Sequence, residues 1–208
     1  MTAGIDAALV RAAMRAAAAA LAANAATLTE LDQAVGDGDL GVTAAKVAAT
    51  LAACAEDTAE ADLGRLIGQA GVAINRAAPS TMGTLIATAL MRAGQVVRGK
   101  QQAEPADLAA MLEAADAAIQ ARGKARPGDK TLIDAIHPAA EAFSAALAAG
   151  AALPEAAEKM VAAARAGRDR VTELPNKVGR ASWLGPRSAG HIDPGATLAL
   201  LVLEALAG

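Results

Sequence analysis

Three aspartates, Asp32, Asp37 and Asp39, lie close together in the sequence and alternate with glycines at positions 36, 38 and 41. Glycine allows a tightly bent backbone, so the three carboxylates can project toward one point. Carboxylates that close repel one another strongly unless a cation neutralises them. An incomplete shell of hard oxygen ligands suits magnesium that is completed by phosphate oxygens and water. We therefore predict that these aspartates hold magnesium against a nucleotide phosphate tail.

Other interpretations of this segment are weaker or simpler. Its glycines match the spacing G-x-G-x-x-G of dinucleotide-binding loops, but no strand precedes them and no βαβ unit surrounds them. An EF-hand would need later ligands, including a glutamate at its twelfth position, that are missing here. The simplest alternative is that Asp37 and Asp39 cap the following helix, whose free amide groups accept a carboxylate.

A second polar segment, Ser80-Thr81-Met82-Gly83-Thr84, opens an expected helix. Its hydroxyl groups and backbone amides are suited to hold a phosphate at the positive end of that helix. The alternative is an ordinary Ser/Thr helix cap.

A third segment, residues 123–131, nearly matches a P-loop, but Asp129 stands before Lys130 where the motif requires glycine, and no strand leads in. A turn on Pro127 and Gly128, with Asp129 capping the next helix, explains most of this segment. Gly123 would still allow a flat ligand to approach the backbone.

The fourth segment, residues 179–195, contains Arg180, whose forked guanidinium suits phosphate or a surface ion pair. His191 is too isolated from any cysteine or second suitable histidine to indicate a transition-metal site. Pro194-Gly195 most simply marks the turn before the last helix.

Helices must position these segments, because 54% of the residues are hydrophobic, only 1% are aromatic, and no sustained strand-like alternation appears. We predict an all-α single domain over residues 1–208. In an up-and-down bundle, the four polar segments, 31–43, 77–84, 123–131 and 179–195, would converge at one end. The eight expected helices lie near Ile5–Ala26, Val42–Ala55, Asp62–Arg76, Met82–Arg98, Pro105–Arg122, Leu132–Ala149, Pro154–Val171 and Ala196–Leu206.

Composition excludes several classes of function. The net charge is −3 without a basic stripe, and Phe143 and Trp183 are the only aromatic residues, which argues against nucleic acid as a partner. Cys54 is the single cysteine and cannot form an internal disulfide, which fits a cytoplasmic protein. Residues 11–25 imitate a secretion signal, but the pattern continues as a helix. No apolar run reaches the roughly 18 residues that a membrane span needs.

Taken together, the four segments resemble the L subunit, or L domain, of dihydroxyacetone kinases over essentially the whole chain. The resemblance rests on four stretches in the same order: Leu31-Asp32 followed by Val35-Gly36-Asp37-Gly38-Asp39, then Pro127-Gly128-Asp129-Lys130-Thr131, then Gly179-Arg180-Ala181-Ser182, and Gly190-His191-Ile192-Asp193-Pro194-Gly195.

The resemblance implies an eight-helix antiparallel up-and-down barrel that carries ADP or ATP and two magnesium ions in loops at one end. Asp32, Asp37 and Asp39 match the metal ligands, and Arg180 matches a phosphate-side arginine. The remaining matches are Leu40, Gly41, Val42, Thr43, Ala77 and Ala78 near the phosphates, Gly123 and Leu132 beside the adenine and ribose, and Asp193, Pro194 and Gly195 as a closing nucleotide contact.

Two positions depart from the family pattern. Ala78 stands where the family carries a serine, and nearby Ser80 or Thr81 is expected to compensate. Leu40 stands where His or Thr is common. The metal ligands are retained, whereas phosphate handling and the sugar served are expected to be where this chain has diverged.

The resemblance also implies partners. In that family a separate K subunit holds dihydroxyacetone covalently through a histidine and docks against the nucleotide end, a part that neither His137 nor His191 is expected to play. Some relatives exchange free ATP for ADP, whereas in others a phosphoryl carrier of the phosphotransferase system recharges bound ADP. Formation of a homo-oligomer stays open.

Two further hypotheses belong to other classes. In one, the chain is a nucleotide-loaded adaptor or regulator without catalytic activity. In the other, it is a plain helical scaffold. The adaptor would bind nucleotide without supporting ketose phosphorylation. The scaffold predicts no magnesium-dependent nucleotide binding at all.

Overall fold

The computed structural model describes residues 4–208, which fold almost entirely into helices. The predicted all-α class is confirmed. A two-residue antiparallel ladder joins β1 (Ile5–Asp6) to β2 (Gln102–Ala103). The helices of the described residues are α1 (Ala7–Ala23), α2 (Ala25–Val35), α3 (Leu40–Ala55), α4 (Leu63–Ala77), α5 (Thr81–Val96), α6 (Pro105–Gly123), α7 (Ile133–Ala148), α8 (Leu153–Arg170), the 3-10 helix η1 (Arg180–Ser188) and α9 (Pro194–Ala207).

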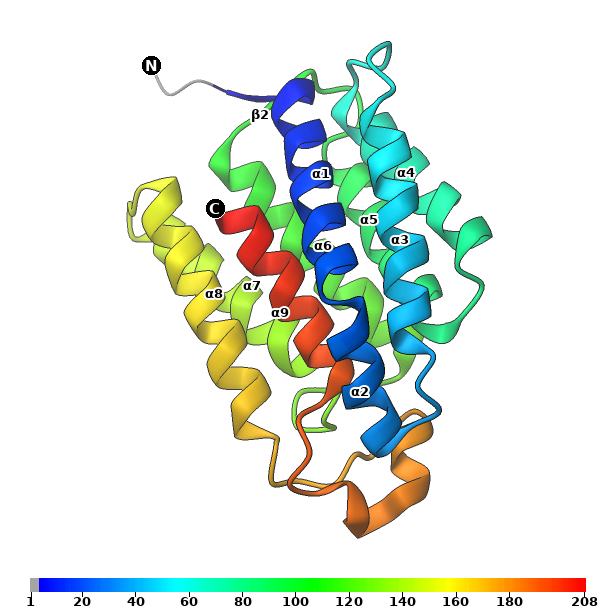
Figure 1. The fold of residues 1–208 in the computed structure, drawn as a ribbon. Coiled ribbons are helices and arrows are strands. Elements are labelled where there is room, and N and C mark those ends of the chain that lie inside the picture. The colour runs from blue at the N-terminus through cyan, green and yellow to red at the C-terminus, as the bar shows by residue number, and fades with distance from the viewer. Residues whose placement is uncertain (1–3) are drawn as a thin grey trace.

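The α-helices form a closed ring in which chain neighbours pack side by side (Figure 1). From α3 to α9 each helix packs on the next, and α9 and α3 both pack on α1. Helix α2 continues the track of α1 and also packs on α3 and α9. The ring therefore has eight positions, with α1 and α2 sharing one, as predicted for an eight-helix barrel.

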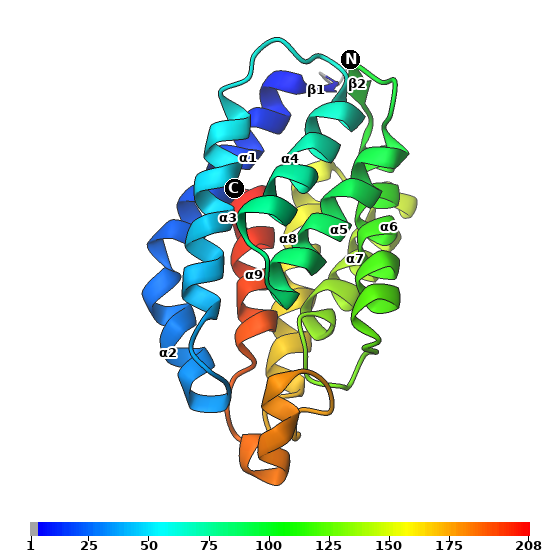
Figure 2. The same cartoon turned by 90° about the vertical axis from the view of Figure 1, so that its right-hand side faces the viewer.

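Successive positions of the ring run in opposite directions, so the connections alternate between its two ends (Figure 2). One end carries the connections α2–α3, α4–α5, α6–α7 and α8–α9, together with η1. These connections contain the four polar segments, and their predicted convergence at one end is confirmed.

The first expected helix, Ile5–Ala26, was wrong in its boundaries. The structure divides this stretch at Asn24, whose backbone N–H and side-chain amide both donate to the carbonyl of Ala20. A second helix then runs on to Val35. Only Leu28 and Val35 are buried along this second helix, so few apolar positions marked it in the sequence. As a result, Asp32 lies in the last turn of a helix, not in a loop.

Small residues set how closely the helices pack. A Cβ atom on Gly64 in α4 would lie 2.4 Å from the carbonyl oxygen of Gly94 in α5, and one on Gly167 in α8 would lie 2.0 Å from that of Asp134 in α7. Buried alanine, leucine and isoleucine side chains fill the space between the helices. Close-packed helices of this kind hold their ends, and the loops attached to them, in fixed relative positions.

Among the helices of residues 4–208, none combines the length and apolar character needed to cross a bilayer.

Candidate functional site

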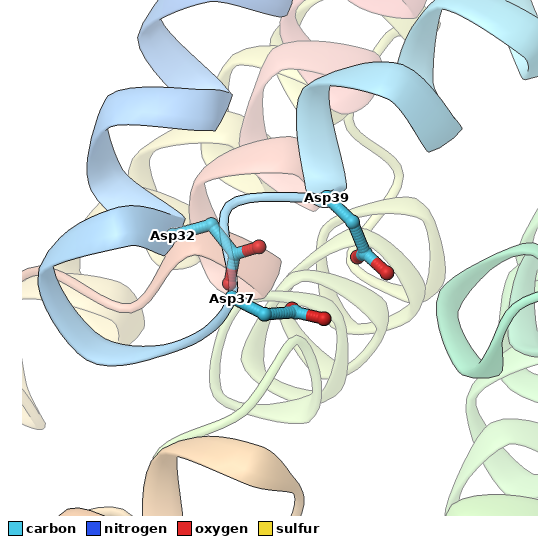
Figure 3. A group of neighbouring side chains, drawn as sticks. All are labelled: Asp32, Asp37 and Asp39. Atoms are coloured by element: carbon cyan, nitrogen blue, oxygen red, sulfur yellow. The ribbon is translucent and has the colours of Figure 1, made fainter.

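The three predicted metal ligands come together at the polar end of the ring (Figure 3). Asp32, Asp37 and Asp39 each offer one carboxylate oxygen, and these oxygens lie within 4.8 Å of one another. Asp32 comes from the end of α2, Asp39 immediately precedes α3, and Asp37 lies in the turn between them. A divalent cation needs this kind of cluster of hard oxygen ligands.

Glycines make this turn possible. A Cβ atom on Gly36 would lie 2.6 Å from Asp32 Oδ1, so any side chain there would displace that carboxylate. Gly38 has φ +77°, a left-handed conformation that other residues rarely adopt. A Cβ atom on Gly41 would lie 2.1 Å from the carbonyl oxygen of Ala25, so α3 can approach α2 only without one. The glycine pattern of the sequence thus places the carboxylates.

The cap alternative named Asp37 and Asp39, but the carboxylate that meets the start of α3 is that of Asp32. Asp32 Oδ2 accepts a hydrogen bond of 3.1 Å from the backbone N–H of Leu40 at the start of α3. Asp39 occupies the cap position of α3, but its side chain accepts no capping hydrogen bond. The side chains of Asp37 and Asp39 are 45% and 53% exposed. Two carboxylates therefore face solvent without a structural task in capping that helix.

Arg180 brings the fourth loop to this cluster. It is the first residue of η1, and its guanidinium contacts the carboxylate of Asp37 and lies 3.5 Å from Asp39 Oδ2. An ion pair was one of the two roles expected for Arg180, and here its partners are the predicted metal ligands. The guanidinium offsets part of the charge that the clustered carboxylates create.

The second loop contacts the first through hydroxyl groups. Ser80 Oγ caps α5 by accepting the N–H of Gly83 at 3.0 Å, and it lies 3.1 Å from Thr43 Oγ1 in α3. Thr43 and Ala78 are buried, whereas Thr81 is exposed. Ser80 therefore fills the cap role expected of a serine while joining the starts of α3 and α5.

The third loop differs from its expected form. The carboxylate of Asp129 accepts the N–H of Arg126 at 2.8 Å and does not cap α7, as was expected. Asp134, within the first turn of α7, accepts the N–H groups of Gly128 at 2.5 Å and Thr131 at 2.8 Å instead. The turn is thus closed from inside the helix that follows it.

The fourth loop ends in a buried carboxylate. Asp193 is 6% exposed, caps α9 by accepting the N–H of Ala196 at 2.8 Å, and accepts the side-chain N–H of Asn176 at 2.9 Å. Burial raises the pKa of Asp193 to about 6, against the lowering effect of these hydrogen bonds. Its carboxylate is therefore used within the fold, and the expected nucleotide contact at this position can involve only the backbone of residues 193–195.

Several of the remaining predicted positions lie close to atoms of other loops and helices. A Cβ atom on Gly195 would lie 3.1 Å from Met82 Cε and 3.4 Å from the backbone nitrogen of Leu132, so the second, third and fourth loops meet there. Gly123, at the end of α6, faces Leu85 of α5. Leu40, Gly41, Leu132, Pro194 and Gly195 are buried, and Val42 and Ala77 are exposed.

Sequence reasoning missed a group of buried polar residues beneath this end. Lys130, Asn176 and Ser188 are at most 5% exposed. Lys130 donates to the carbonyl of Ser188, and Asn176 donates to the carbonyl of Lys130 and to the hydroxyl of Ser188. Lys130 stood within a quoted motif, but its neighbours Pro127 and Gly128 indicated only a turn. Its partners lie 42 to 58 residues away in the sequence, so no local pattern marked it.

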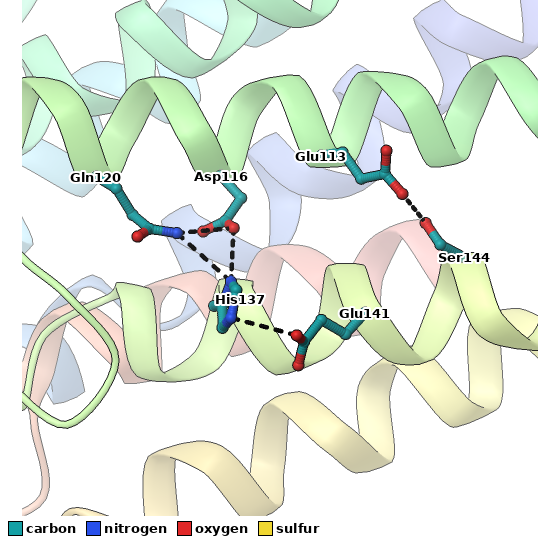
Figure 4. A network of polar contacts seen from close by, with 6 residues as sticks. All are labelled: Glu113, Asp116, Gln120, His137, Glu141 and Ser144. Atoms are coloured by element: carbon teal, nitrogen blue, oxygen red, sulfur yellow. Dashed lines mark hydrogen bonds and ion pairs between the residues drawn. The ribbon is translucent and has the colours of Figure 1, made fainter.

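The two histidines lie apart from the aspartate cluster. His191 is exposed. His137 is on α7, where its Nδ1 lies 2.8 Å from Asp116 of α6 and its Nε2 lies 3.4 Å from Glu141 (Figure 4). The hydrogen bond to Asp116 raises the pKa of His137, and nearby Glu141 and Asp134 add to this effect. This network links two helices of the ring wall.

Comparison with protein families identifies one match. The family model described as the DAK2 domain matches residues 34–208. This range includes all four polar loops except the last residues of α2 before position 34.

Two curated relatives illustrate the sequence similarity. The ADP-binding subunit DhaL of the PEP-dependent dihydroxyacetone kinase of Escherichia coli is 30% identical over 180 residues, 86% of this chain and 86% of the relative. The L-erythrulose kinase of Pectobacterium atrosepticum is 33% identical over 199 residues, which cover 95% of this chain and 34% of that protein. The chain thus spans about a third of the second relative.

Solved structures show the same fold. The crystal structure of the dihydroxyacetone kinase of C. freundii in its native form superposes with a TM-score of 0.75 at 29% identity. The crystal structure of the kinase from C. freundii in complex with AMP-PNP and Mg2+ superposes with a TM-score of 0.72. Each match covers 96% of this chain, but 34% and 33% of the longer crystallised chains.

Proposed function

Because this chain belongs to the DAK2 domain family, we propose that it is the nucleotide- and magnesium-binding part of a kinase for dihydroxyacetone or a related small ketose. In this proposal residues 1–208 act as one nucleotide-binding domain that works with a separate sugar-binding K subunit. The observation that carries the proposal is the cluster of Asp32, Asp37 and Asp39, whose oxygens lie within 4.8 Å at the end where the four polar loops meet.

The donor atoms of this cluster fit magnesium. All three are carboxylate oxygens, and three protein ligands leave coordination positions for phosphate oxygens and water. We assign Asp32, Asp37 and Asp39 as ligands of two magnesium ions bound with ADP or ATP. When bound, such ions withdraw charge from the β- and γ-phosphates.

Several residues of this chain are already positioned to bind the metal and the phosphates. The backbone N–H of Leu40 orients the carboxylate of Asp32, so this ligand is held in place before metal binds. Arg180 already lies beside Asp37 and Asp39, where its guanidinium can turn to stabilise charge on the transferred phosphoryl group. The starts of α3 and α5, with Gly41 to Thr43, Ser80 and Thr81, supply backbone amides and hydroxyls for phosphate oxygens.

The remaining assigned positions form the base side. We assign Gly123 and Leu132 to the adenine and ribose, and Ala77 and Ala78 of the second loop to the phosphates. Because the Asp193 carboxylate is buried and hydrogen-bonded, residues 193–195 act through their backbone. In this proposal the nucleotide lies between the ends of closely packed helices.

The acceptor sugar is assigned to a partner. His137 is held between Asp116 and Glu141 on the ring wall, far along the chain from the aspartate loop, and is a poor candidate for covalent attachment of a ketose. The relatives, a dihydroxyacetone kinase subunit and an L-erythrulose kinase, indicate the substrate class. The phosphoryl donor is either free ATP or a phosphoryl carrier that recharges bound ADP, and the oligomeric state is left open.

The test is reconstitution. The purified chain is mixed with a purified K-type dihydroxyacetone-binding subunit, Mg2+-ATP and either dihydroxyacetone or L-erythrulose, and 31P NMR follows the phosphorylated ketose. A second series replaces ATP with catalytic ADP and a phosphorylated carrier protein. We expect product only when both subunits and one donor are present. Magnesium-dependent ADP binding without product in any mixture would favour the adaptor, and no nucleotide binding would favour the plain scaffold.

A further inference from the structure

The motif Pro127-Gly128-Asp129-Lys130-Thr131 has no part in the metal site, yet Lys130 is a completely buried cation at the same end of the ring. Its backbone has φ +59°, a left-handed conformation that is unfavourable for a residue with a side chain. Burying a charged group in a strained conformation costs free energy unless its partners compensate. A residue placed this way is therefore held by specific contacts.

Those contacts are three backbone carbonyls of the connection between α8 and α9, which includes the fourth loop. Lys130 Nζ donates to the carbonyl oxygens of Thr172 at 2.7 Å, Leu174 at 2.8 Å and Ser188 at 2.8 Å. A neutral amine has only two N–H donors, so three acceptors at these distances require the charged ammonium. Burial lowers the pKa of Lys130, while the charges of Asp193 and Glu173 oppose this effect.

The three carbonyls lie on both sides of the segment that carries Arg180. Thr172 and Leu174 follow α8, Ser188 is the last residue of η1, and Arg180 is the first residue of η1. The ammonium therefore clasps the beginning and the end of the loop together.

Neighbouring hydrogen bonds reinforce the clasp. The side chain of Asn176 donates to the carbonyl of Lys130 and to Asp193, and its backbone N–H donates to Ser188 Oγ at 2.9 Å. Gly190 donates its backbone N–H to the carbonyl of Thr172 at 2.9 Å. The loop is thus anchored at its base, while Trp183 in η1 is 84% exposed to solvent.

We infer that Lys130 is a positioning residue for phosphoryl transfer, which fixes the fourth loop so that Arg180 lies over the aspartate cluster. The inference rests on the proposed function for its catalytic consequence, but the anchoring itself does not depend on nucleotide. Small displacements of a charge-stabilising group cost transfer rate because its contacts matter most in the transition state.

The structural part is tested by hydrogen-exchange mass spectrometry on Lys130→Met, a side chain of similar length without donors. We expect faster exchange in peptides covering residues 172–190, with peptides from α3, α4 and α5 unchanged. Lys177→Met is the matched control, because this lysine lies on the same connection between α8 and α9, and its exposed side chain makes only a solvent-screened ion pair, 3.6 Å from Asp129. If Lys130→Met does not fold, Lys130→Gln, which keeps two N–H donors without the charge, loosens the same anchor more gently. Unchanged exchange in the loop would overturn the inference.

The catalytic part is tested in the reconstituted kinase. We expect Lys130→Met to lower kcat about 100-fold with the KM for ketose unchanged, because the ketose binds the partner. In an Arg180→Ala background, Lys130→Met should lower kcat by less than about 3-fold, since the group it positions is gone. Multiplicative losses in the double variant would show that Lys130 does not act through Arg180. Failure of the wild-type mixture to make product would count against the proposed function alone and would leave the exchange result intact.

Discussion

The carboxylates at the polar end of the ring have two opposite kinds of surroundings. Asp37 and Asp39 are about half exposed, and Arg180 is their nearest counter-charge. Asp134, in the first turn of α7, and Asp193, on the fourth loop, are 4% and 6% exposed, and each accepts two N–H groups. The buried pair closes turns and caps a helix.

These different surroundings indicate different roles for the two pairs of aspartates. A buried carboxylate that accepts two hydrogen bonds stabilises the fold, because its removal leaves donors unpaired. Exposed carboxylates held a few ångströms apart repel one another and contribute little to stability. The proposed function attributes their close placement to a cation that binds between them, so the two kinds of aspartate should respond to substitution in opposite ways.

The largest expected effect is on the exposed side of this comparison. Asp39→Asn should lower phosphoryl transfer in the reconstituted kinase about 1,000-fold, because the metal loses a charged ligand. The free energy of unfolding without nucleotide should change by less than about 0.5 kcal/mol, since one repulsive charge is removed from an exposed site. Enzyme assays and urea denaturation measure the two quantities. A large loss of stability with activity retained would assign Asp39 a structural role.

The next effect concerns the buried side. Asp134→Ala should lower the free energy of unfolding by about 3 kcal/mol, because the N–H groups of Gly128 and Thr131 lose their acceptors. Urea denaturation measures this loss, and Glu158→Gln on the exposed face of α8 is the matched control with no expected change. A cost for Asp134→Ala as small as that of the control would remove the distinction between the two groups.

The smallest expected effect is on the pH dependence of stability, and it concerns another buried carboxylate. Asp116 is paired with His137 on the ring wall (Figure 4). The raised pKa of His137 means that the folded state binds its proton more tightly than the unfolded state. This stabilisation is fully present below the ordinary histidine pKa of 6.5 and is lost as pH rises through the higher folded value.

Denaturation at pH 5.5 to 8.5 measures this contribution. His137→Gln should flatten the decline of unfolding free energy with rising pH, whereas His191→Gln, at the exposed histidine, should leave it unchanged. The same slope in wild type and His137→Gln would mean that the pair with Asp116 does not stabilise the charged imidazole.

The sequence predicted the parts of this molecule that depend on local chemistry. Glycine and proline marked the ends of most helices, and alternating directions then placed the four polar loops at one end. The aspartate cluster was also predictable, because its three carboxylates and the glycines that bend the backbone lie within one short segment.

Features made by distant residues were not predictable in the same way. From the sequence, Asp37 and Asp39 were the possible caps of α3, but Asp32 accepts the hydrogen bond from Leu40, because that contact depends on how α2 ends. The extension of that helix to Val35 was missed because few of its residues face the core. The clasp of Lys130 joins residues 42 to 58 positions apart, which no local pattern records.

The central claim is that the exposed aspartates hold a metal against a nucleotide. It is tested most directly by thermal and urea unfolding of the chain with ADP, in magnesium and in EDTA, for wild type, Asp37→Asn/Asp39→Asn and Glu158→Gln. We predict that ADP at about 100 times its Kd adds roughly 2.7 kcal/mol to the wild type and to Glu158→Gln only when magnesium is present. The double variant should gain almost nothing at the same ADP concentration. Equal stabilisation in EDTA, or an undiminished gain in the double variant, would contradict the account.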